Sequence, residues 1–250
     1  MIRLSERPIA APSANLFSHV SPTSAIHVFN DFFDKDVSVI DGPRCEFGIE
    51  STVAKLIKDE KGSRILILRA GSLSDKALKE ALLKSNKFKD VPVEKIKTEA
   101  HVSEEVNSEA PGMLLKHYSP YIETYLVEVV NSLPQDTTEI VEINPKETVL
   151  IDFGKGLKSI SQDYLQYFSL TDDGNLREAM GQLYSVLRAA ENVSGAQQIL
   201  ILNISTYFAS NESVINELPE YLETVYDKSF RSASGKKLKF HTKSKNFFKV

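Results

Sequence analysis

The sequence predicts an α/β protein made of two domains joined by a linker. Apolar runs of strand length alternate with helical patterns in both halves of the chain, which is typical of mixed and parallel α/β sheets. Between the halves the hydrophobic periodicity fades and acidic residues collect, which is typical of a linker. We therefore expect a mixed α/β domain over residues 1–94, a linker over 95–123 and a small Rossmann-like domain over 124–250.

The first domain is expected to contain two helices and several short strands. Residues 21–33 place apolar side chains at helical spacing, with Ser21 as the N-cap and Pro22 at the first helical position. A second, amphipathic helix is expected over residues 74–85. Strand-like runs are predicted in four places, over residues 9–11, 37–40, 51–57 and 64–68.

The second domain has the alternation of a doubly wound sheet. Residues 148–153 and 198–203 are short and apolar throughout, as in strands that are buried on both faces. Between them, residues 176–192 predict a helix, and a further helix is expected over 213–226. The apolar face of the first of these helices is formed by Leu176, Met180, Leu183 and Leu187.

The linker closes with the segment A-P-G-M-L-L-K-H-Y-S-P, residues 110–120. Long linkers that carry aromatic and basic residues are also typical of lids that close over a ligand. Tyr118 could stack on a base or bond to a phosphate, with Lys116 and His117 adding charge. A tyrosine packed on a domain surface is the alternative.

The composition is that of a globular protein, with 42% apolar and 26% charged residues. No run approaches 18 apolar residues, so we expect no membrane span, and the N-terminus lacks the apolar stretch of a signal peptide. Cys45 is the only cysteine, which excludes an intramolecular disulfide and favours a reducing compartment. We therefore expect a cytoplasmic protein; the oligomeric state is left open.

The last 23 residues are strongly basic. From Lys228 onward there are eight Lys or Arg and no Asp or Glu, although the whole chain has a net charge of -4. Such a tail is expected to be a solvated, partly disordered terminus. Contact with RNA or an acidic partner is the alternative.

Two hydroxyl-bearing motifs occur early in the first domain. In A-A-P-S-A-N, Pro12 stiffens a turn from which Ser13 and Asn15 present a hydroxyl and an amide, groups that suit phosphate or ribose oxygens. A turn that caps the next element is the alternative. Ser21, in S-P-T, can cap its helix and still contact an anion there.

A second pair of signatures surrounds the two predicted β runs. In G-I-E-S-T-V, Ser51 and Thr52 point to opposite faces of a strand, so only one can face a given pocket. Arg69 ends an apolar run and precedes Ala70-Gly71, where a cation suits a phosphate or carboxylate. An edge threonine and a surface arginine are the alternatives.

Several common sites are excluded by pattern. The five histidines have no metal-ligand spacing with cysteine or with each other, so no metal site is expected. The chain contains no G-x-x-x-x-G-K-[ST], no G-x-G-x-x-G and no G-x-S-x-G. A nucleotide site must therefore use another geometry.

Taken in order, the four signatures resemble the long, two-domain form of the YrdC-type L-threonylcarbamoyladenylate synthases. The chain reads P-I-A-A-P-S-A-N over residues 8–15, then S-P-T, G-I-E-S-T-V, R-A-G and K-H-Y-S-P. The resemblance covers residues 1–123 by motif, and the second domain by element order. It implies a YrdC-like α/β domain, here without its N-terminal part, followed by the small Rossmann-like domain.

The resemblance implies a nucleotidyl transfer in which L-threonine, bicarbonate and ATP give threonylcarbamoyl-AMP and pyrophosphate, for threonylcarbamoyladenosine in tRNA. It implies that Ala11 and Ser51 contact L-threonine, with magnesium accompanying the triphosphate. ATP would be contacted by Ser13, Ser21, Arg69 and Tyr118. Asn15 and Thr52 are possible additional contacts, and no covalent nucleophile is implied.

The family pattern begins upstream of Pro8, with a threonine-rich turn and a Lys-x-Arg pair that this sequence does not contain. Losing several charge-assisted contacts, each about 1.5–3 kcal/mol, would lower activity by orders of magnitude. Two alternatives to an active synthase therefore stay open. One is a non-catalytic nucleotide- or RNA-binding remnant, and the other is a half-enzyme that needs a separately encoded N-terminal piece.

Overall fold

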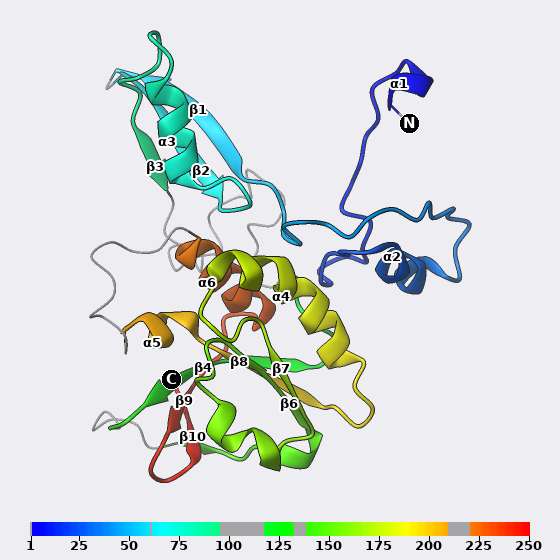
Figure 1. Ribbon diagram of the computed structural model, residues 1–250, viewed down its shortest axis with the longest axis vertical. Coiled ribbons are helices and arrows are strands. Elements are labelled where there is room, and N and C mark those ends of the chain that lie inside the picture. Colours follow the sequence, from blue (N-terminus) through cyan, green and yellow to red (C-terminus); the bar gives the residue numbers. More distant parts are fainter. Residues whose placement is uncertain (1, 61, 96–117, 133–138, 210–220) are drawn as a thin grey trace.

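The computed structural model describes residues 2–60, 62–95, 118–132, 139–209 and 221–250 (Figure 1). The α-helices are α1 (Ile2–Ser5), α2 (Ala25–Phe32), α3 (Asp75–Leu83), α4 (Leu176–Glu191), α5 (Ile204–Ala209) and α6 (Leu222–Ser232), with 3-10 turns η2 (Pro145–Glu147) and η3 (Lys158–Asp163). The strands are β1 (Val53–Asp59), β2 (Gly62–Arg69), β3 (Val93–Lys95), β4 (Glu123–Val130), β5 (Ile140–Val141), β6 (Thr148–Asp152), β7 (Gln166–Ser169), β8 (Gln198–Leu202), β9 (Lys237–His241) and β10 (Asn246–Lys249).

The second half forms a seven-stranded sheet in the order β5-β10-β9-β4-β8-β6-β7. The five strands from β9 to β7 are parallel, and β10 runs antiparallel to both of its neighbours. All five residues of β6 are buried, and so are the last four of β8, because helices and loops cover this part of the sheet. The predicted α/β class and both buried strands are confirmed.

Helix α4 is the main cover of this sheet, and its sequence explains its limits. Asn175 caps the first turn, where its side chain accepts hydrogen bonds from the backbone N–H groups of Arg177 and Glu178. The face that carries Met180, Leu183 and Leu187 is fully buried. The predicted helix over 176–192 is therefore confirmed.

The first half contributes a separate three-stranded sheet. Strands β1 and β2 form an antiparallel hairpin, and β3 adds to β2 in parallel. Helix α3 begins after Ser74, whose hydroxyl accepts from the backbone N–H of Ala77. The β runs at 51–57 and 64–68 and the helix at 74–85 are confirmed. Figure 1 places this sheet and α3 at one end of the molecule, away from α1 and α2.

Three local predictions for the first half are wrong. Helix α2 begins at Ala25 rather than next to Pro22, so Ser21 is not its N-cap. Residues 37–40 and 9–11 form no strand, since no neighbouring segment of the described chain pairs with them. β propensity alone cannot form a strand without a partner.

The basic tail is folded, so the expected solvated terminus is wrong. Residues 222–232 form α6, and β9 and β10 enter the sheet. The side chains of Lys228 and Arg231 are buried, at 0% and 4% exposure. The helix expected over 213–226 is found only in part, because α6 begins at Leu222 and residues 210–220 lie outside the described residues. Most of the predicted linker, residues 96–117, also lies outside them.

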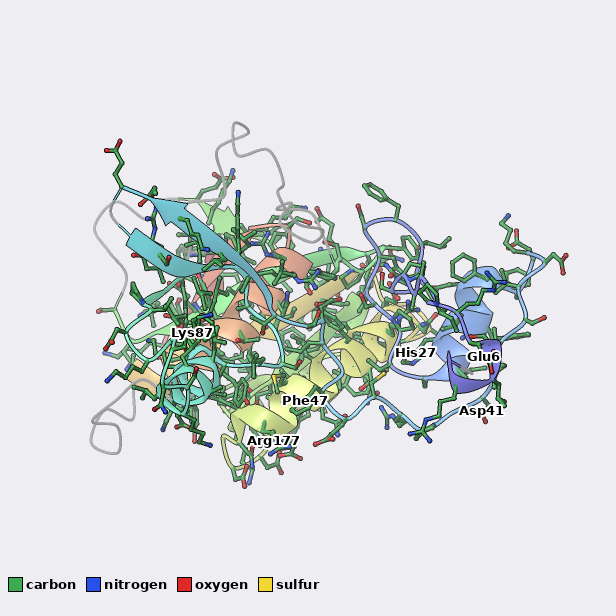
Figure 2. All side chains as sticks on the ribbon, turned by 90° about the horizontal axis from the view of Figure 1, so that it is seen from above. Glu6, His27, Asp41, Phe47, Lys87 and Arg177 are labelled. Carbon is green, nitrogen blue, oxygen red and sulfur yellow. The ribbon has the colours of Figure 1, made fainter. Side chains whose placement is uncertain are left out.

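The segment between Val20 and Glu50 packs on α4 and so connects the two halves. A Cβ on Gly48, whose φ is +64°, would lie 2.6 Å from the carbonyl oxygen of Gly181 in α4, so the two backbones meet directly. Figure 2 shows Phe47 beside Arg177, whose guanidinium carbon lies 5.3 Å from the ring centroid. Among the described residues no helix is long and apolar enough to span a membrane.

Candidate functional site

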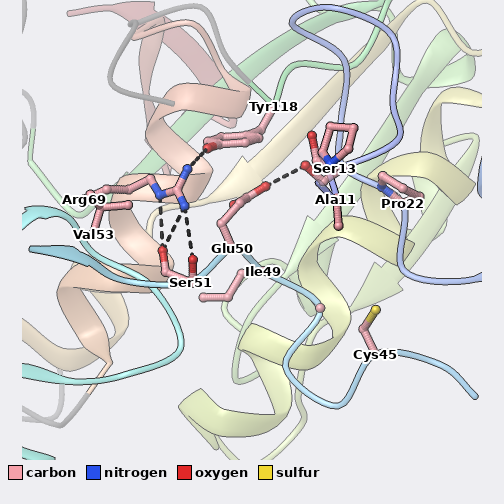
Figure 3. Close-up of a pocket in the computed structure, with 13 residues that line it drawn as sticks. Ala11, Ser13, Pro22, Cys45, Ile49, Glu50, Ser51, Val53, Arg69 and Tyr118 are labelled. Carbon is pink, nitrogen blue, oxygen red and sulfur yellow. Dashed lines mark hydrogen bonds between the residues drawn. The ribbon is translucent and has the colours of Figure 1, made fainter. Parts of the chain in front are cut away.

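A cavity of about 540 Å³ lies where the N-terminal segment, the start of β1, the end of β2 and the chain at Tyr118 meet (Figure 3). Most of the lining residues lie in loops or at the ends of strands, where the direction of a side chain is not set by the alternation of a strand. Its described lining residues are Ala11, Pro12, Ser13, Ser21, Pro22, Cys45, Gly48, Ile49, Glu50, Ser51, Val53, Arg69 and Tyr118.

The structure brings six of the eight sequence-predicted site residues to this cavity, namely Ala11, Ser13, Ser21, Ser51, Arg69 and Tyr118. Asn15 does not line it, because its side-chain amide donates to the carbonyls of Leu16 and His19, each at 2.9 Å. Thr52 does not line it either, since its hydroxyl is bonded to the backbone of Leu73. Ser51 and Thr52 thus point apart, as their alternation predicts.

Hydrogen bonds from the guanidinium group fix the side chain of Arg69 at the cavity wall. Its Nε and one terminal nitrogen donate to the carbonyl oxygen of Ser51 at 3.2 and 3.0 Å. The other terminal nitrogen donates to the hydroxyl of Tyr118 at 3.4 Å. A guanidinium fixed in this way presents a cation with a defined orientation to an anionic ligand.

Tyr118 is buried rather than packed loosely on a domain surface. Its φ is +60°, a left-handed conformation, and its carbonyl accepts from the hydroxyl of Ser232 at 2.9 Å. Its ring stacks on Tyr184 with centroids 5.5 Å apart. Burial, followed by the charge of Glu50, raises the pKa of Tyr118 far above its ordinary value. The phenol is therefore a neutral hydrogen-bonding group.

Glu50 is a central residue of the cavity that the motif analysis did not single out. One carboxylate oxygen accepts from the hydroxyl of Ser21 at 2.5 Å, and the other accepts from the hydroxyl of Tyr184 at 2.9 Å. Glu50 was visible only as a letter inside G-I-E-S-T-V. Tyr184 lies 134 positions away and looks like an ordinary core residue of α4, so no local signal could join them.

Lys228 is the other residue that sequence analysis missed. The predicted basic tail included it as one of eight tail cations, yet its Nζ lies 3.7 Å from a carboxylate oxygen of Glu50 and 4.8 Å from the ring centroid of Tyr118. Its neighbour Asp227 is paired with Arg231, at 3.0 Å. The second half of the chain therefore supplies charge directly behind the cavity wall.

The lining suits a ligand that is anionic and rich in hydrogen-bonding groups. Arg69 supplies a cation, and Ser13 and Ser51 supply hydroxyls. Glu50 is the only carboxylate among the described lining residues, and it already accepts from Ser21 and Tyr184. In the described part of the chain no group of three or more His, Cys, Asp or Glu is placed to hold a metal ion.

Two family models together match most of the chain. Residues 73–218 match the C-terminal domain of threonylcarbamoyl-AMP synthase, and residues 1–71 match a family described as telomere recombination. Among curated relatives, the threonylcarbamoyl-AMP synthase of Pyrococcus abyssi is 38% identical over 128 residues, which is 51% of this chain and 34% of that protein. The enzyme of the same name from Schizosaccharomyces pombe is 34% identical over 142 residues, 57% of this chain and 32% of that protein.

A solved structure agrees with these matches. The crystal structure of Pyrococcus abyssi Sua5 complexed with L-threonine matches with a TM-score of 0.65 and 27% identity, and the match covers 96% of this chain and 62% of that one. This chain thus spans less than two thirds of its solved relative, and its aligned segments span about a third of the curated relatives. The chain belongs to the threonylcarbamoyl-AMP synthase family, as defined by the C-terminal domain that residues 73–218 match.

Proposed function

We propose that this chain forms threonylcarbamoyl-AMP and pyrophosphate from L-threonine, bicarbonate and ATP, for threonylcarbamoyladenosine in tRNA. The observation that carries the proposal is the convergence of six motif residues, spread over residues 11–118, on one cavity of about 540 Å³. That volume is in the range of small-ligand sites. The archaeal relative was solved with L-threonine, and we extend this ligand to the present cavity.

In the proposed site, Ala11 and Ser51 contact L-threonine, while Ser13, Ser21, Arg69 and Tyr118 contact ATP. The amine of threonine attacks bicarbonate with loss of water to give a carbamate. A carbamate oxygen then attacks the α-phosphorus, and the bond to the β-phosphate breaks to release pyrophosphate. Arg69 would stabilise the negative charge, and positioning would supply much of the rate.

The hydroxyl of Ser21 can act in this scheme only with its lone pairs. Its single proton is donated to Glu50 at 2.5 Å, so it has none for a phosphate oxygen. It can accept from a donor such as a ribose hydroxyl. Magnesium would enter with the triphosphate and be held through the phosphates, because Glu50, the one described lining carboxylate, is already engaged.

The direct test is pyrophosphate release by the purified chain with ATP, bicarbonate and L-threonine. We expect release that depends on threonine. Release no greater than in a reaction without threonine would refute autonomous synthesis by this chain. Nucleotide binding without release would instead support the non-catalytic binding protein, and release restored by a separate N-terminal piece would support the half-enzyme.

Cys45 provides a second test that does not require turnover. It lines the cavity, is exposed, and is the only cysteine of the chain. We expect ATP together with L-threonine to slow its alkylation by iodoacetamide several-fold, because ligands in the cavity would shield the thiol. An alkylation rate that neither ligand changes, followed by mass spectrometry, would contradict ligand binding at this cavity.

Arg69→Lys is expected to weaken binding of a non-hydrolysable ATP analogue by about tenfold to a hundredfold, because one charge-assisted hydrogen bond contributes about 1.5–3 kcal/mol. A lysine ammonium cannot contact Ser51 and Tyr118 and still present a fork to phosphate. Arg64→Lys, on the same strand but in an exposed pair with Asp59, is the matched control. Calorimetry that shows equal affinities for the two variants would contradict the role of Arg69.

RNA contact through the tail and a cytoplasmic location remain parts of the proposal. Lys228 and Arg231 are buried, and Lys236 and Lys249 pair with Glu123 and Glu139. Lys237 lies over the rings of Tyr226 and Phe230, so tail contact with RNA would depend mainly on the three other lysines, Lys239, Lys243 and Lys245. Neutralising these three should abolish any salt-dependent retention of tRNA on the protein. The reducing compartment is supported by Cys45, which is free.

A further inference from the structure

Lys228 is a fully buried ammonium that no hydrogen bond satisfies among the described residues. Its side chain is 0% exposed, and its Nζ has no hydrogen-bond partner. The closest carboxylate oxygens belong to Glu50, at 3.7 Å, and Asp227, at 3.8 Å. Burial is the largest influence on the pKa of Lys228 and lowers it. An isolated charge in such a place is costly.

The two carboxylates near Lys228 differ in what else they bind. Asp227 accepts from Arg231 through both oxygens, at 3.0 and 3.1 Å, so its charge has another partner. Glu50 accepts only from the neutral hydroxyls of Ser21 and Tyr184 in the described chain. Lys228 is also the only cation within 4.0 Å of Glu50 among the described residues. Of the two carboxylates, Glu50 is therefore the one for which Lys228 is the only nearby cation in the described chain.

Lys228 also lies next to Tyr118, a second residue that lines the cavity. Its Nζ lies 4.8 Å from the ring centroid of Tyr118, within the range of a cation–π contact, and Tyr118 receives Arg69 through its hydroxyl. One buried ammonium thus lies against the two residues, Glu50 and Tyr118, that orient Ser21 and Arg69. A buried ion pair is weak evidence for stability, because replacing the whole pair by apolar groups is often neutral or stabilising.

We propose that Lys228 is a positioning residue of the cavity: from α6 it holds the Glu50 carboxylate and the Tyr118 ring in the geometry that binds ligand. The described lining of the cavity comes from residues 11–118, and in this proposal a residue of the second half of the chain is also needed for ligand binding. The identity of the ligands, ATP and L-threonine, rests on the proposed function; the positioning of Glu50 and Tyr118 does not.

The central experiment compares Lys228→Met with Lys236→Met. Lys236 also pairs with a glutamate, Glu123 at 2.7 Å, and lies 5.4 Å from a tyrosine ring centroid, Tyr125. It is 46% exposed, however, and neither of these partners is a described lining residue of the cavity. We expect Lys228→Met to weaken binding of a non-hydrolysable ATP analogue with L-threonine by about tenfold. Its Tm should fall, because Glu50 loses its nearby cation, so the affinity is compared per folded molecule. Lys236→Met should change neither the affinity nor the Tm.

If Lys228 were merely structural, Lys228→Met would lower the Tm but leave the affinity per folded molecule unchanged, and that result would overturn the proposal. Glu50→Gln provides a second background. If Lys228 acts through Glu50, adding Lys228→Met to Glu50→Gln should cost little further affinity. A further tenfold loss in the double variant would contradict the mechanism even if Lys228→Met alone did not fold. Lys228→Arg, which keeps the charge, should recover part of the affinity.

If the unaltered chain binds neither ATP nor L-threonine, the proposed function is refuted, but the positioning role of Lys228 can still be tested by NMR. The ring resonance of Tyr118 can be observed in protein labelled with 13C-tyrosine and assigned with Tyr118→Phe. Lys228→Met should shift this resonance, because it removes a charge 4.8 Å from the ring centroid, and Lys236→Met should not. An unchanged Tyr118 resonance in folded Lys228→Met would overturn the proposal.

Discussion

Arg188→Met is expected to lower the free energy of unfolding by about 3–5 kcal/mol, the cost of leaving one member of a buried ion pair without its partner. Arg188, in α4, donates to the two carboxylate oxygens of Asp31 at 2.9 and 2.6 Å and to the carbonyl of Val20. Both side chains are 6% exposed. The substitution would remove the arginine from the Asp31 carboxylate, which lies buried between the two halves of the chain and would keep only the weaker contact with His19, at 3.6 Å, among the ion pairs of the described residues.

The control for this prediction is Arg177→Met on the same helix. Arg177 pairs with Glu46 at 2.8 Å, but the two side chains are 65% and 72% exposed, so the loss should stay below about 1 kcal/mol. Denaturant unfolding of both variants measures the difference. Equal losses of unfolding free energy in Arg188→Met and Arg177→Met would show that burial of the Arg188–Asp31 pair does not contribute to stability.

The effect of Arg188→Met should also depend on pH. Burial raises the pKa of Asp31, but the hydrogen bonds and charge of Arg188 outweigh burial, so this pKa lies below its ordinary value of 3.8. A lowered pKa contributes stability that is complete above the ordinary value and is lost as the pH falls through the lower one. The stability difference between the unaltered chain and Arg188→Met should therefore narrow below about pH 4. A difference that stays constant down to pH 2 would contradict the Asp31 contact.

Gly71→Ala is expected to destabilise the chain by about 1–3 kcal/mol and to abolish ligand binding at the cavity. A Cβ on Gly71 would collide with the backbone of Glu50, Ser51 and Thr52, which cannot move aside as a flexible side chain could. The backbone N–H of Ser72 also donates to the carbonyl of Glu50 at 3.1 Å, so the two segments are joined there. Relief of the collision would displace Glu50 and Ser51, both of which line the cavity.

Gly42→Ala is the matched substitution, because a Cβ there would meet nothing within 4 Å. It should leave stability within about 0.5 kcal/mol of the unaltered chain. Thermal unfolding of both variants measures the change in stability. Protection of Cys45 from alkylation by ATP and L-threonine measures ligand binding at the cavity. A Gly71→Ala protein that keeps full stability and full protection would show that this close approach is not required.

A feature of this protein could be predicted from the sequence when the residues that determine it lie close together along the chain. Strands β1, β2, β6 and β8 and helices α3 and α4 follow from local hydrophobic pattern, so they were predicted. The caps Ser74 and Asn175, which set where the two helices begin, are seen in the structure. The strand expected over residues 37–40 was wrong because a strand needs a partner that local sequence does not specify. The solvated tail was wrong because counting charges cannot reveal that Arg231 is buried beside Asp227.

By itself the sequence determined the α/β class, most of the regular elements and the motif residues that line the cavity, because these depend on neighbours along the chain and on recognisable short patterns. Only the tertiary structure decided that Glu50 accepts from Ser21 and Tyr184, and that Lys228 lies behind them. The contacts of Glu50 with Tyr184 and Lys228, 134 and 178 positions away, arise from packing α4 and α6 against the first half. Tyr184 and Lys228 have unremarkable local sequences, and only their burial beside Glu50 makes them part of the site.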